Sequence, residues 1–231
     1  MVSILSLIAS PLLMAGKPGL CFDHVRRIGG ALTMYADQYD GLYPRSYEYS
    51  RQPTGRYRRI NWSARLAPFL PSQSVFRCPA DPSRPPIPRL NGVADAQAPV
   101  LSYVPNYAVM PTGAGYLHPV SRQDIDDPAS LIAFAERQSE GPLKPYAGVS
   151  AFLPDSPAPG QTYRRVSLKE VELAVAAKSD QTVKLARVAW RRHDGLSNFA
   201  FTEGHVRALA LSETLIPSRP IWGDHFYPSS P

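Results

Sequence analysis

Proline places the strongest constraint on what this chain can fold into. The sequence has 231 residues, and 25 of them are proline, which is roughly twice the usual share. Proline breaks the interior of helices and is confined to edges and bulges in sheets, so this content excludes a long helical bundle or a regular solenoid. The chain must contain many loops and short strands instead. Apolar residues still make up 44% of it, which is enough for a hydrophobic core.

A proline-free stretch at residues 20–40 predicts an amphipathic helix. The apolar positions of its stripe are Val25, Ile28, Leu32, Tyr35 and Tyr39. Their spacings of three or four residues are those of one helix face. Cys21 lies one turn before this stripe on the same face. Asp40-Gly41 then indicates the end of the helix, because glycine readily adopts the left-handed conformation of a C-terminal cap.

The last third of the chain predicts an antiparallel β-meander, because apolar and polar residues alternate in three consecutive segments. The expected strands are residues 186–192, 197–202 and 205–211. The connecting turns are expected at residues 193–195 and 203–204. A two-residue second turn places Phe201 opposite Val206 and Phe199 opposite Ala208.

Between these two parts the sequence predicts loops and short elements. The expected elements are a polar, aromatic loop at 43–60, a short helix at 62–70 interrupted at Pro68, an irregular proline-rich stretch at 79–99, a strand at 102–110 kinked at Pro105 and a buried strand at 130–135. Residues 137–186 are interpreted as an insertion that carries one helix, indicated by the capping box of Ser167 and Glu170. The expected fold class is therefore α+β, with the N-terminal helix packed on an antiparallel sheet in a single domain at residues 20–231.

Residues 1–19 form a separate apolar N-terminal segment. Its uncharged part, residues 1–14, is shorter than the roughly 20 apolar residues of a membrane-spanning helix and contains Pro11. Three interpretations stay open at this point. The segment is an export signal with Ala15-Gly16 in its cleavage region, the lower part of a longer membrane or amphipathic helix whose start is missing, or a buried terminal helix.

Several short motifs carry a family resemblance through their order and spacing. They are Cys21-x6-Ile28-Gly29, Tyr35-Ala36-Asp37, Gly41-x2-Pro44, Phe76-Arg77-Cys78-Pro79-x-Asp81, Ser102-Tyr103-x3-Tyr107, and His193 followed after nine residues by Glu203-Gly204, with Asn198 between them. The chain thereby resembles bacterial prepilin-like proteins of the processing-associated His-x9-Asp-Gly class. It departs from the family pattern in having Glu203 in place of aspartate and in lacking a recognisable prepilin cleavage motif, so processing and assembly residues are not carried over.

The resemblance implies a pilin-like fold and a structural role without enzymatic activity. The expected function is that of a pilin or pseudopilin-like subunit of a type II secretion or type IV pilus-like assembly. Its expected partners are other pilin-like subunits or secretion machinery, and the membrane if a fuller N-terminal helix is present. The expected location is the cell envelope, either anchored in the inner membrane or in the periplasmic or extracellular space.

Cys21 and Cys78 fit an exported head of this kind. A disulfide between them closes a loop of about 58 residues, worth roughly 4 kcal/mol in the loop-entropy model. It requires an oxidising compartment. The alternative is a pair of reduced, buried thiols.

We expect no catalytic site and no cofactor. The five histidines are scattered, and two cysteines are too few for a structural zinc site of four cysteine and histidine ligands. His193 and Glu203 do not share a metal ion if they lie at opposite ends of one strand, because a strand rises about 3.3 Å per residue. Calcium held by loop carboxylates is a further option. The candidate ligands are Asp81, Asp126 and Asp127.

The Arg/Tyr-rich segment at residues 45–65 gives the alternative function. It interleaves aromatic rings with the guanidinium groups of Arg51, Arg56, Arg58 and Arg59. This mixture suits phosphate or another polyanion, and the net charge of the chain is +6. The alternative is therefore an exported binding module that recognises a polyanion. Arginine is frequent throughout the chain, so nucleic acid is not the expected partner.

Overall fold

The computed structural model describes residues 17–51, 53–55, 57–82, 89–90, 93–94, 101–112, 118–138, 148–153, 164–224 and 227. Helices and antiparallel sheets together confirm the α+β class in this part of the chain. Residues 1–16, and with them the three interpretations of the apolar N-terminus, lie outside the described residues.

The longest described helix, α1 (Lys17–Gln38), forms where the apolar stripe predicts it. The fully buried side chains of this stripe are those of Cys21, Val25, Ile28 and Leu32. The helix ends at Gln38, and Asp40 and Gly41 shortly after it have left-handed φ angles of 53° and 81°. The Gly41 amide donates a hydrogen bond to the Ala36 carbonyl, as expected for a glycine cap.

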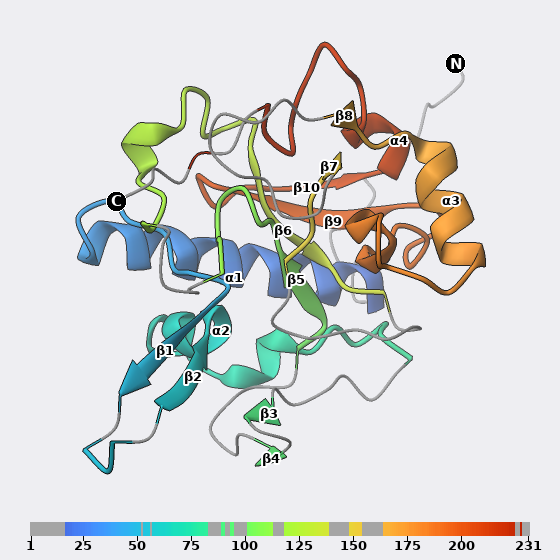
Figure 1. Cartoon of the computed structure of the whole chain (residues 1–231). Helices are drawn as coiled ribbons and strands as arrows, with labels where there is room; N and C mark the ends of the chain where they lie inside the picture. Colours follow the sequence, from blue (N-terminus) through green and yellow to red (C-terminus); the bar gives the residue numbers. More distant parts are fainter. Residues whose placement is uncertain are drawn as a thin grey trace, which may run out of the picture.

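The main sheet has four antiparallel strands in the order β10-β9-β6-β5 (Figure 1). They are β5 (Tyr103–Pro105), β6 (Ile132–Glu136), β9 (Ser197–Phe201) and β10 (Val206–Leu209). The predicted buried strand at 130–135 is confirmed as β6, and the predicted C-terminal hairpin as β9 and β10. The strand predicted at 102–110 is confirmed only at its start, because β5 ends at its proline.

The prediction of a three-stranded C-terminal meander is wrong. Residues 186–192 form no strand. The 3-10 helix η5 (Lys184–Arg187) ends within them, and Val188 makes only an isolated bridge to Arg137. The second neighbour of β9 is β6, whose five residues are all buried. A central strand covered on both sides must be apolar on both faces, and β6 meets this requirement better than the arginine-rich segment 186–192.

The register of the β9–β10 hairpin differs by one residue from the prediction. Ala200 pairs with Val206, where Phe201 was expected, and the other pairs shift with it. The reason lies in the turn. The Phe201 amide donates to the His205 carbonyl, and Gly204, with φ of 87°, completes a loop of three residues instead of two.

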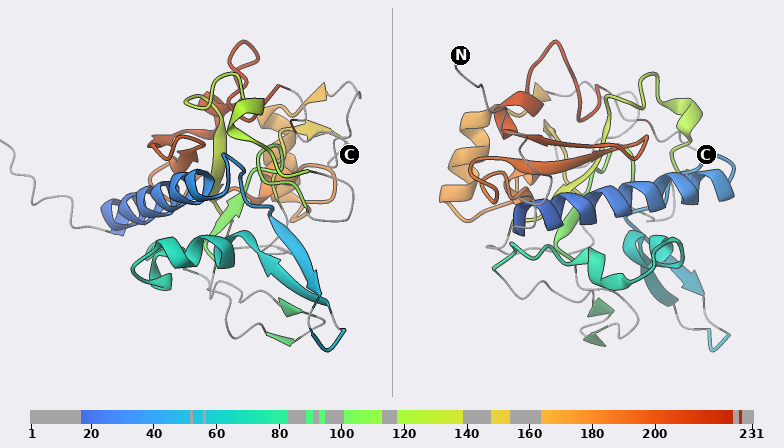
Figure 2. Two further views of the ribbon diagram at one scale, coloured as in Figure 1. Left: turned by 90° about the vertical axis from the view of Figure 1, so that its left-hand side faces the viewer. Right: turned by 180° about the vertical axis from the view of Figure 1, so that it is seen from behind.

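One face of the sheet is covered by α1. This helix runs between the β9–β10 hairpin and a second layer made of α2 (Trp62–Leu66) and the 3-10 helix η3 (Gln73–Phe76), as both views of Figure 2 show. The core on this side joins the buried stripe of α1 to Trp62 and to Phe134 of β6. The helix is therefore enclosed along much of its length, which fixes its position relative to the sheet.

The opposite face is covered by α3 (Leu168–Ala176), η5 and α4 (Leu211–Thr214). Phe199 and Phe201 of β9 point into this second core. The segment interpreted as an insertion supplies much of the core, including Val149, Val166, Val171, Val183 and Leu185. The predicted capping box is confirmed, because Ser167 and Glu170 bond each other's backbone amides at the start of α3.

The segment at 43–60 forms a β-hairpin, not the loop that we predicted. Strands β1 (Tyr47–Arg51) and β2 (Tyr57–Asn61) pair in antiparallel register. The helix predicted at 62–70 is confirmed, with its interruption: α2 passes into the 3-10 helix η2 (Ala67–Phe69) at Pro68. The remaining elements are η4 (Arg122–Asp124), β3 (Arg89–Leu90) paired with β4 (Val93–Ala94), and β7 (Phe152–Leu153) paired with β8 (Arg164–Arg165).

Candidate functional site

The predicted disulfide is present. Cys21, near the start of α1, and Cys78, just after η3, are joined with their Cα atoms 5.1 Å apart. Both residues are fully buried. The bond spans a sequence separation of 57 residues and links the start of α1 to the layer below it. The reduced alternative is not the state found here.

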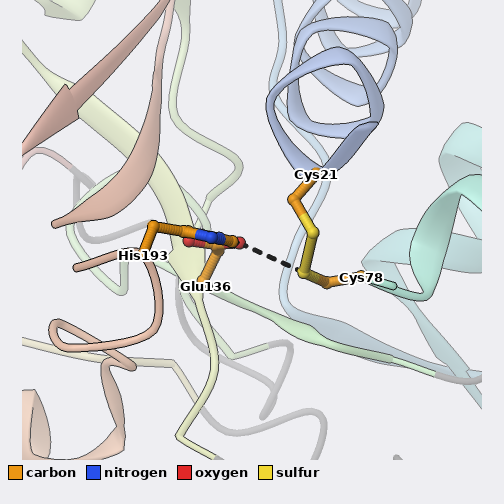
Figure 3. A group of neighbouring side chains, drawn as sticks. All are labelled: Cys21, Cys78, Glu136 and His193. Carbon is orange, nitrogen blue, oxygen red and sulfur yellow. Dashed lines mark hydrogen bonds and ion pairs between the residues drawn. A yellow bond between two sulfur atoms is a disulfide. The ribbon is translucent and has the colours of Figure 1, made fainter. Parts of the chain in front are cut away.

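A buried carboxylate lies beside this disulfide (Figure 3). Glu136 is the last residue of β6 and is fully buried. Its Oε2 accepts hydrogen bonds from the Asn198 amide at 2.9 Å and from the Ser197 hydroxyl at 3.3 Å. Its Oε1 lies 2.8 Å from His193 Nε2 and 3.4 Å from Cys78 Sγ. Both oxygens are thus occupied, which offsets the cost of removing a carboxylate from water.

His193 is held in place by the turn before β9. Its backbone amide and carbonyl bond those of Leu196. Asp194 and Gly195 between them have φ angles of 52° and 89°, as a tight two-residue turn of this type requires. The His193 Nδ1 is buried with no hydrogen-bond partner among the described residues. Because an ionised carboxylate oxygen only accepts hydrogen bonds, Nε2 is assigned as the ring nitrogen that donates to Glu136.

Tyr103 pairs with Glu136 across β5 and β6 and is also fully buried. Burial raises the pKa of this phenol well above its usual value, and the neighbouring charge of Glu136 raises it further. The side chain is therefore a neutral phenol over the physiological pH range. Its hydroxyl makes no hydrogen bond within the described part of the chain.

A second group of buried charges adjoins this site. Asp81, three residues after Cys78, lies 3.9 Å from an Arg137 nitrogen and 3.7 Å from an Arg192 nitrogen. The Arg137 Nε also donates to the Leu101 carbonyl at 3.0 Å. Burial lowers the pKa of Arg137 to about 10, and the charge of Asp81 opposes this shift. Arg137 thus remains protonated at neutral pH, and the group consists of one carboxylate between two guanidinium groups.

The family motif is divided between the two ends of β9. His193 and Asn198 lie at the Glu136 end, where Asn198 contributes its backbone amide and not its side chain. Glu203 and Gly204 lie in the turn at the other end, and Glu203 is exposed. This agrees with the expectation that His193 and Glu203 occupy successive turns. The acid that His193 contacts is Glu136.

Gly204 contacts the middle of α1. A Cβ atom built on Gly29 would lie 2.5 Å from the Gly204 carbonyl oxygen, and one built on Gly204 would lie 3.0 Å from the Gly29 oxygen and from Thr33 Cγ2. The first distance is too short for any Cβ atom, and the contacts at 3.0 Å are tight enough that the neighbouring atoms would have to move. The motif glycine therefore has two roles: it provides the positive φ of the turn and it allows close approach of the turn to the helix backbone.

The three calcium candidates do not meet at one place. Asp81 is in the arginine group described above. Asp126 and Asp127 are exposed and line a pocket of about 360 Å³ together with Asp224 and Arg219. Calcium binding by these carboxylates stays a prediction.

The arginines of the polyanion hypothesis differ in their surroundings. The Arg59 guanidinium lies over the Tyr47 and Tyr49 rings, 4.8 and 5.4 Å from their centroids, and donates to the Tyr49 hydroxyl. Arg51 is exposed on β1. Arg56 and the Arg58 side chain lie outside the described residues. Arg59 therefore stabilises the hairpin itself, and polyanion binding by the segment stays a prediction.

Glu136, Arg137 and Arg192 are functional residues that no sequence motif indicated. A signal for Glu136 was available, because it follows an apolar strand directly and stands two positions after Phe134. Alternation along a strand places both side chains on the same face, which is the face covered by α1. A carboxylate at such a position indicates a buried polar contact.

Four potential ligand groups meet at this site. The Sγ atoms of Cys21 and Cys78, one carboxylate oxygen of Glu136 and one ring nitrogen of His193 all lie within 4.8 Å of one another. They come from α1, the segment after η3, the end of β6 and the turn before β9. Two sulfurs joined in a disulfide are not thiolates and do not bind metal ions strongly. The site in this form is a covalent and polar junction among four segments.

Comparisons with protein-family models, with curated proteins and with solved structures give no match. The resemblance to prepilin-like proteins is therefore carried by the motifs alone.

Within the described ranges, no helix combines the length and the apolar content required to cross a membrane.

Proposed function

We propose that this chain is a non-enzymatic, pilin-like structural subunit of a type II secretion or type IV pilus-like assembly in the cell envelope. The observation that supports this best is the way in which α1 is fixed within the fold. The Cys21–Cys78 bond holds its start to the segment after η3, and the contact of Gly29 with Gly204 holds its middle to the β9–β10 turn.

The two fixed points have a mechanical consequence. Cys21 and Gly29 are eight residues apart, which corresponds to about 12 Å along a helix. Two points of attachment, one to each of the layers that enclose α1, prevent the helix from pivoting within the fold, whereas one would not. A subunit that assembles through its N-terminal helix needs this property, because force on the helix must reach the head. A disulfide in this position also suits a head that folds in an oxidising compartment.

The buried junction is better suited to a structural role than to catalysis. The Glu136 side chain has no exposed area, and that of His193 is 8% exposed. A substrate cannot reach either group while the disulfide and the surrounding core are intact. Both oxygens of the Glu136 carboxylate also accept hydrogen bonds from groups of the protein. We therefore assign the pair to holding the fold together.

The outer face of α1 offers a surface for neighbouring subunits. Leu20 and Met34 are 47% and 53% exposed, and their spacing of 14 residues places them close to one face of the helix. Burial of these side chains between subunits would stabilise an assembly through the hydrophobic effect.

Photo-cross-linking tests the proposal. The full chain is produced in a bacterium that builds such an assembly, with p-benzoylphenylalanine at Leu20 or at Met34. The control position is Leu173, which is 60% exposed on α3. We expect cross-links to other pilin-like subunits in the envelope fraction from both α1 positions and none from the control. Recovery of the protein in the cytoplasmic fraction, or cross-linking that is no greater at α1 than at Leu173, would overturn the proposal.

A further inference from the structure

The four groups at the junction have the composition of a metal site. A tetrahedral zinc ion binds cysteine sulfur at about 2.3 Å and histidine nitrogen or carboxylate oxygen at about 2.0–2.2 Å. These bond lengths put neighbouring ligand atoms roughly 3.3–3.8 Å apart. The ligand atoms found here are all within 4.8 Å of one another, so small side-chain movements would complete the tetrahedron.

The orientation of the side chains supports this interpretation. The His193 ring and the Glu136 carboxylate both point toward the disulfide, as Figure 3 shows. Glu136 Oε1 lies 3.4 Å from Cys78 Sγ and 2.8 Å from His193 Nε2. The other oxygen of Glu136 is held by the Asn198 amide and the Ser197 hydroxyl. Hydrogen bonds of this kind orient the carboxylate ligand in protein metal sites. The carboxylate is therefore fixed by one backbone amide and one side-chain hydroxyl of β9 before any metal ion arrives.

The oxidation state of the two sulfurs decides whether the site exists. In the disulfide the sulfurs are bonded to each other, whereas metal binding needs thiolates. We propose that the reduced protein binds one zinc ion at this junction. The four ligands are Cys21 Sγ, Cys78 Sγ, His193 Nε2 and Glu136 Oε1. The disulfide and the zinc ion exclude each other. The disulfide bonds α1 to the segment after η3, whereas the zinc ion would also bond the end of β6 and the turn before β9.

Formation of the zinc site takes two steps, reduction of the disulfide and binding of the metal ion. A phosphine reductant breaks the S–S bond, supplies two electrons and becomes a phosphine oxide with oxygen from water, while two thiols form. Zinc binding then releases two thiol protons. The Nε2 proton of His193 moves to Nδ1, which leaves a neutral imidazole with Nε2 free to bind the metal ion. The inference requires only the geometry of this junction and is independent of the proposed role in an assembly.

The first test compares zinc binding in the two redox states of the full chain. Protein reduced with a phosphine under nitrogen, and protein left oxidised, are each incubated with zinc and desalted, and their masses are measured under native conditions. We expect one zinc ion for each reduced chain, with a mass that shows the loss of two protons, and none for the oxidised chain. Cobalt in place of zinc should produce a thiolate charge-transfer band and the visible bands of a tetrahedral ion. Zinc in the oxidised protein, or none in the reduced protein, would overturn the proposal.

The second test uses a matched pair of histidine variants. His193→Gln removes a ligand, whereas His24→Gln removes a histidine whose ring contacts the Arg77 carbonyl outside the four-ligand group. The disulfide holds the fold of each variant in the oxidised state, where circular dichroism verifies folding before reduction. We expect His193→Gln to weaken zinc binding at least about tenfold in competition with a chelator, and His24→Gln to leave it unchanged. Equal affinities would show that the cysteines bind zinc elsewhere or without His193, and the proposed site would be wrong.

Discussion

The two ends of β9 hold α1 by different physical means. At the Ser197 end, a disulfide bonds α1 to the segment after η3, and a buried carboxylate of β6 with its donors lies beside this bond. At the Phe201 end, two glycines bring the turn and the helix backbone into direct contact. The first end depends on covalent chemistry and buried charge, and therefore on redox state and, through the raised pKa of the buried Tyr103 phenol, on alkaline pH. The second depends on the absence of side chains and is insensitive to both.

This difference explains the composition of the motif from His193 to Gly204. At one end of the strand, the histidine provides a ring that donates a hydrogen bond to Glu136. At the other end, the glycine allows the turn to approach the backbone of α1. The nine residues between them span one strand and parts of two turns. Substitutions at the two ends should consequently differ in size and in their dependence on solution conditions.

The largest effect is expected from Glu136→Gln. The glutamine side chain has nearly the same shape, but an NH₂ group replaces one of the two oxygens that accept hydrogen bonds from His193, Ser197 and Asn198. The donor or donors on that side then face another donor and lose their acceptor. Loss of a buried, fully bonded carboxylate should lower the free energy of unfolding by about 3 kcal/mol. Urea unfolding of the oxidised protein measures the change.

The control for this variant is Glu172→Gln, which alters a glutamate that is 46% exposed and 3.7 Å from Arg191. An exposed pair of this kind contributes little, so its effect should stay within about 0.5 kcal/mol. If the two variants were equally stable, the polar end of β9 would not hold the fold as described.

An intermediate effect is expected at the glycine end from Gly29→Ala. The added Cβ would lie 2.5 Å from the Gly204 carbonyl oxygen, so the helix and the turn must move apart. This overpacking should exceed the gain in helix propensity and lower the free energy of unfolding by about 1–2 kcal/mol. Urea unfolding again provides the measurement.

Gly30→Ala is the matched control. Its Cβ would meet no atom within 4 Å, so alanine should stabilise the protein by about 0.5–1 kcal/mol through helix propensity alone. The two neighbouring substitutions should therefore have opposite signs. Equal stabilisation by both would show that the close contact between Gly29 and Gly204 is absent in solution.

The sequence predicts the glycine end of this comparison better than the polar end. Local patterns were sufficient for α1, for β6 and for the β9–β10 hairpin, because periodicity and turn residues act over a few positions. The predicted register of the hairpin was wrong by one residue, because a turn of two residues and a turn of three residues can both accommodate Gly204. In the folded protein the three-residue turn packs against Gly29, which is distant in sequence and enters no local pattern.

The polar end depends on contacts between distant residues that no local pattern contains. Glu136 meets His193 across 57 residues, and Asp81 meets Arg137 and Arg192 from a third segment. A single charged residue after an apolar strand is compatible with either a solvated strand end or a buried partner. The family motif indicated that His193 matters without indicating which acid it contacts. Only the arrangement of β6 beside β9, which the predicted meander did not include, brings the two together.

The smallest effect at neutral pH is expected from Tyr103→Phe, and it separates the two ends by their response to pH. Burial and the charge of Glu136 raise the pKa of the Tyr103 phenol in the folded protein, whereas a tyrosine in the unfolded chain ionises near pH 10. The folded state thus keeps a proton that the unfolded state loses. The wild-type free energy of unfolding should accordingly be unaffected by this group below about pH 10 and should fall as the pH rises further.

Tyr103→Phe should change stability by less than about 1 kcal/mol at pH 7, since the hydroxyl has no hydrogen-bond partner in the described part of the chain. The same variant should make the alkaline decline shallower. Urea unfolding at a series of pH values, with Tyr57→Phe at a position that is 61% exposed as the control, measures both quantities. A decline as steep in Tyr103→Phe as in the control would mean that this phenol is not buried beside Glu136, and the electrostatic character assigned to this end of β9 would then lose one of its supports.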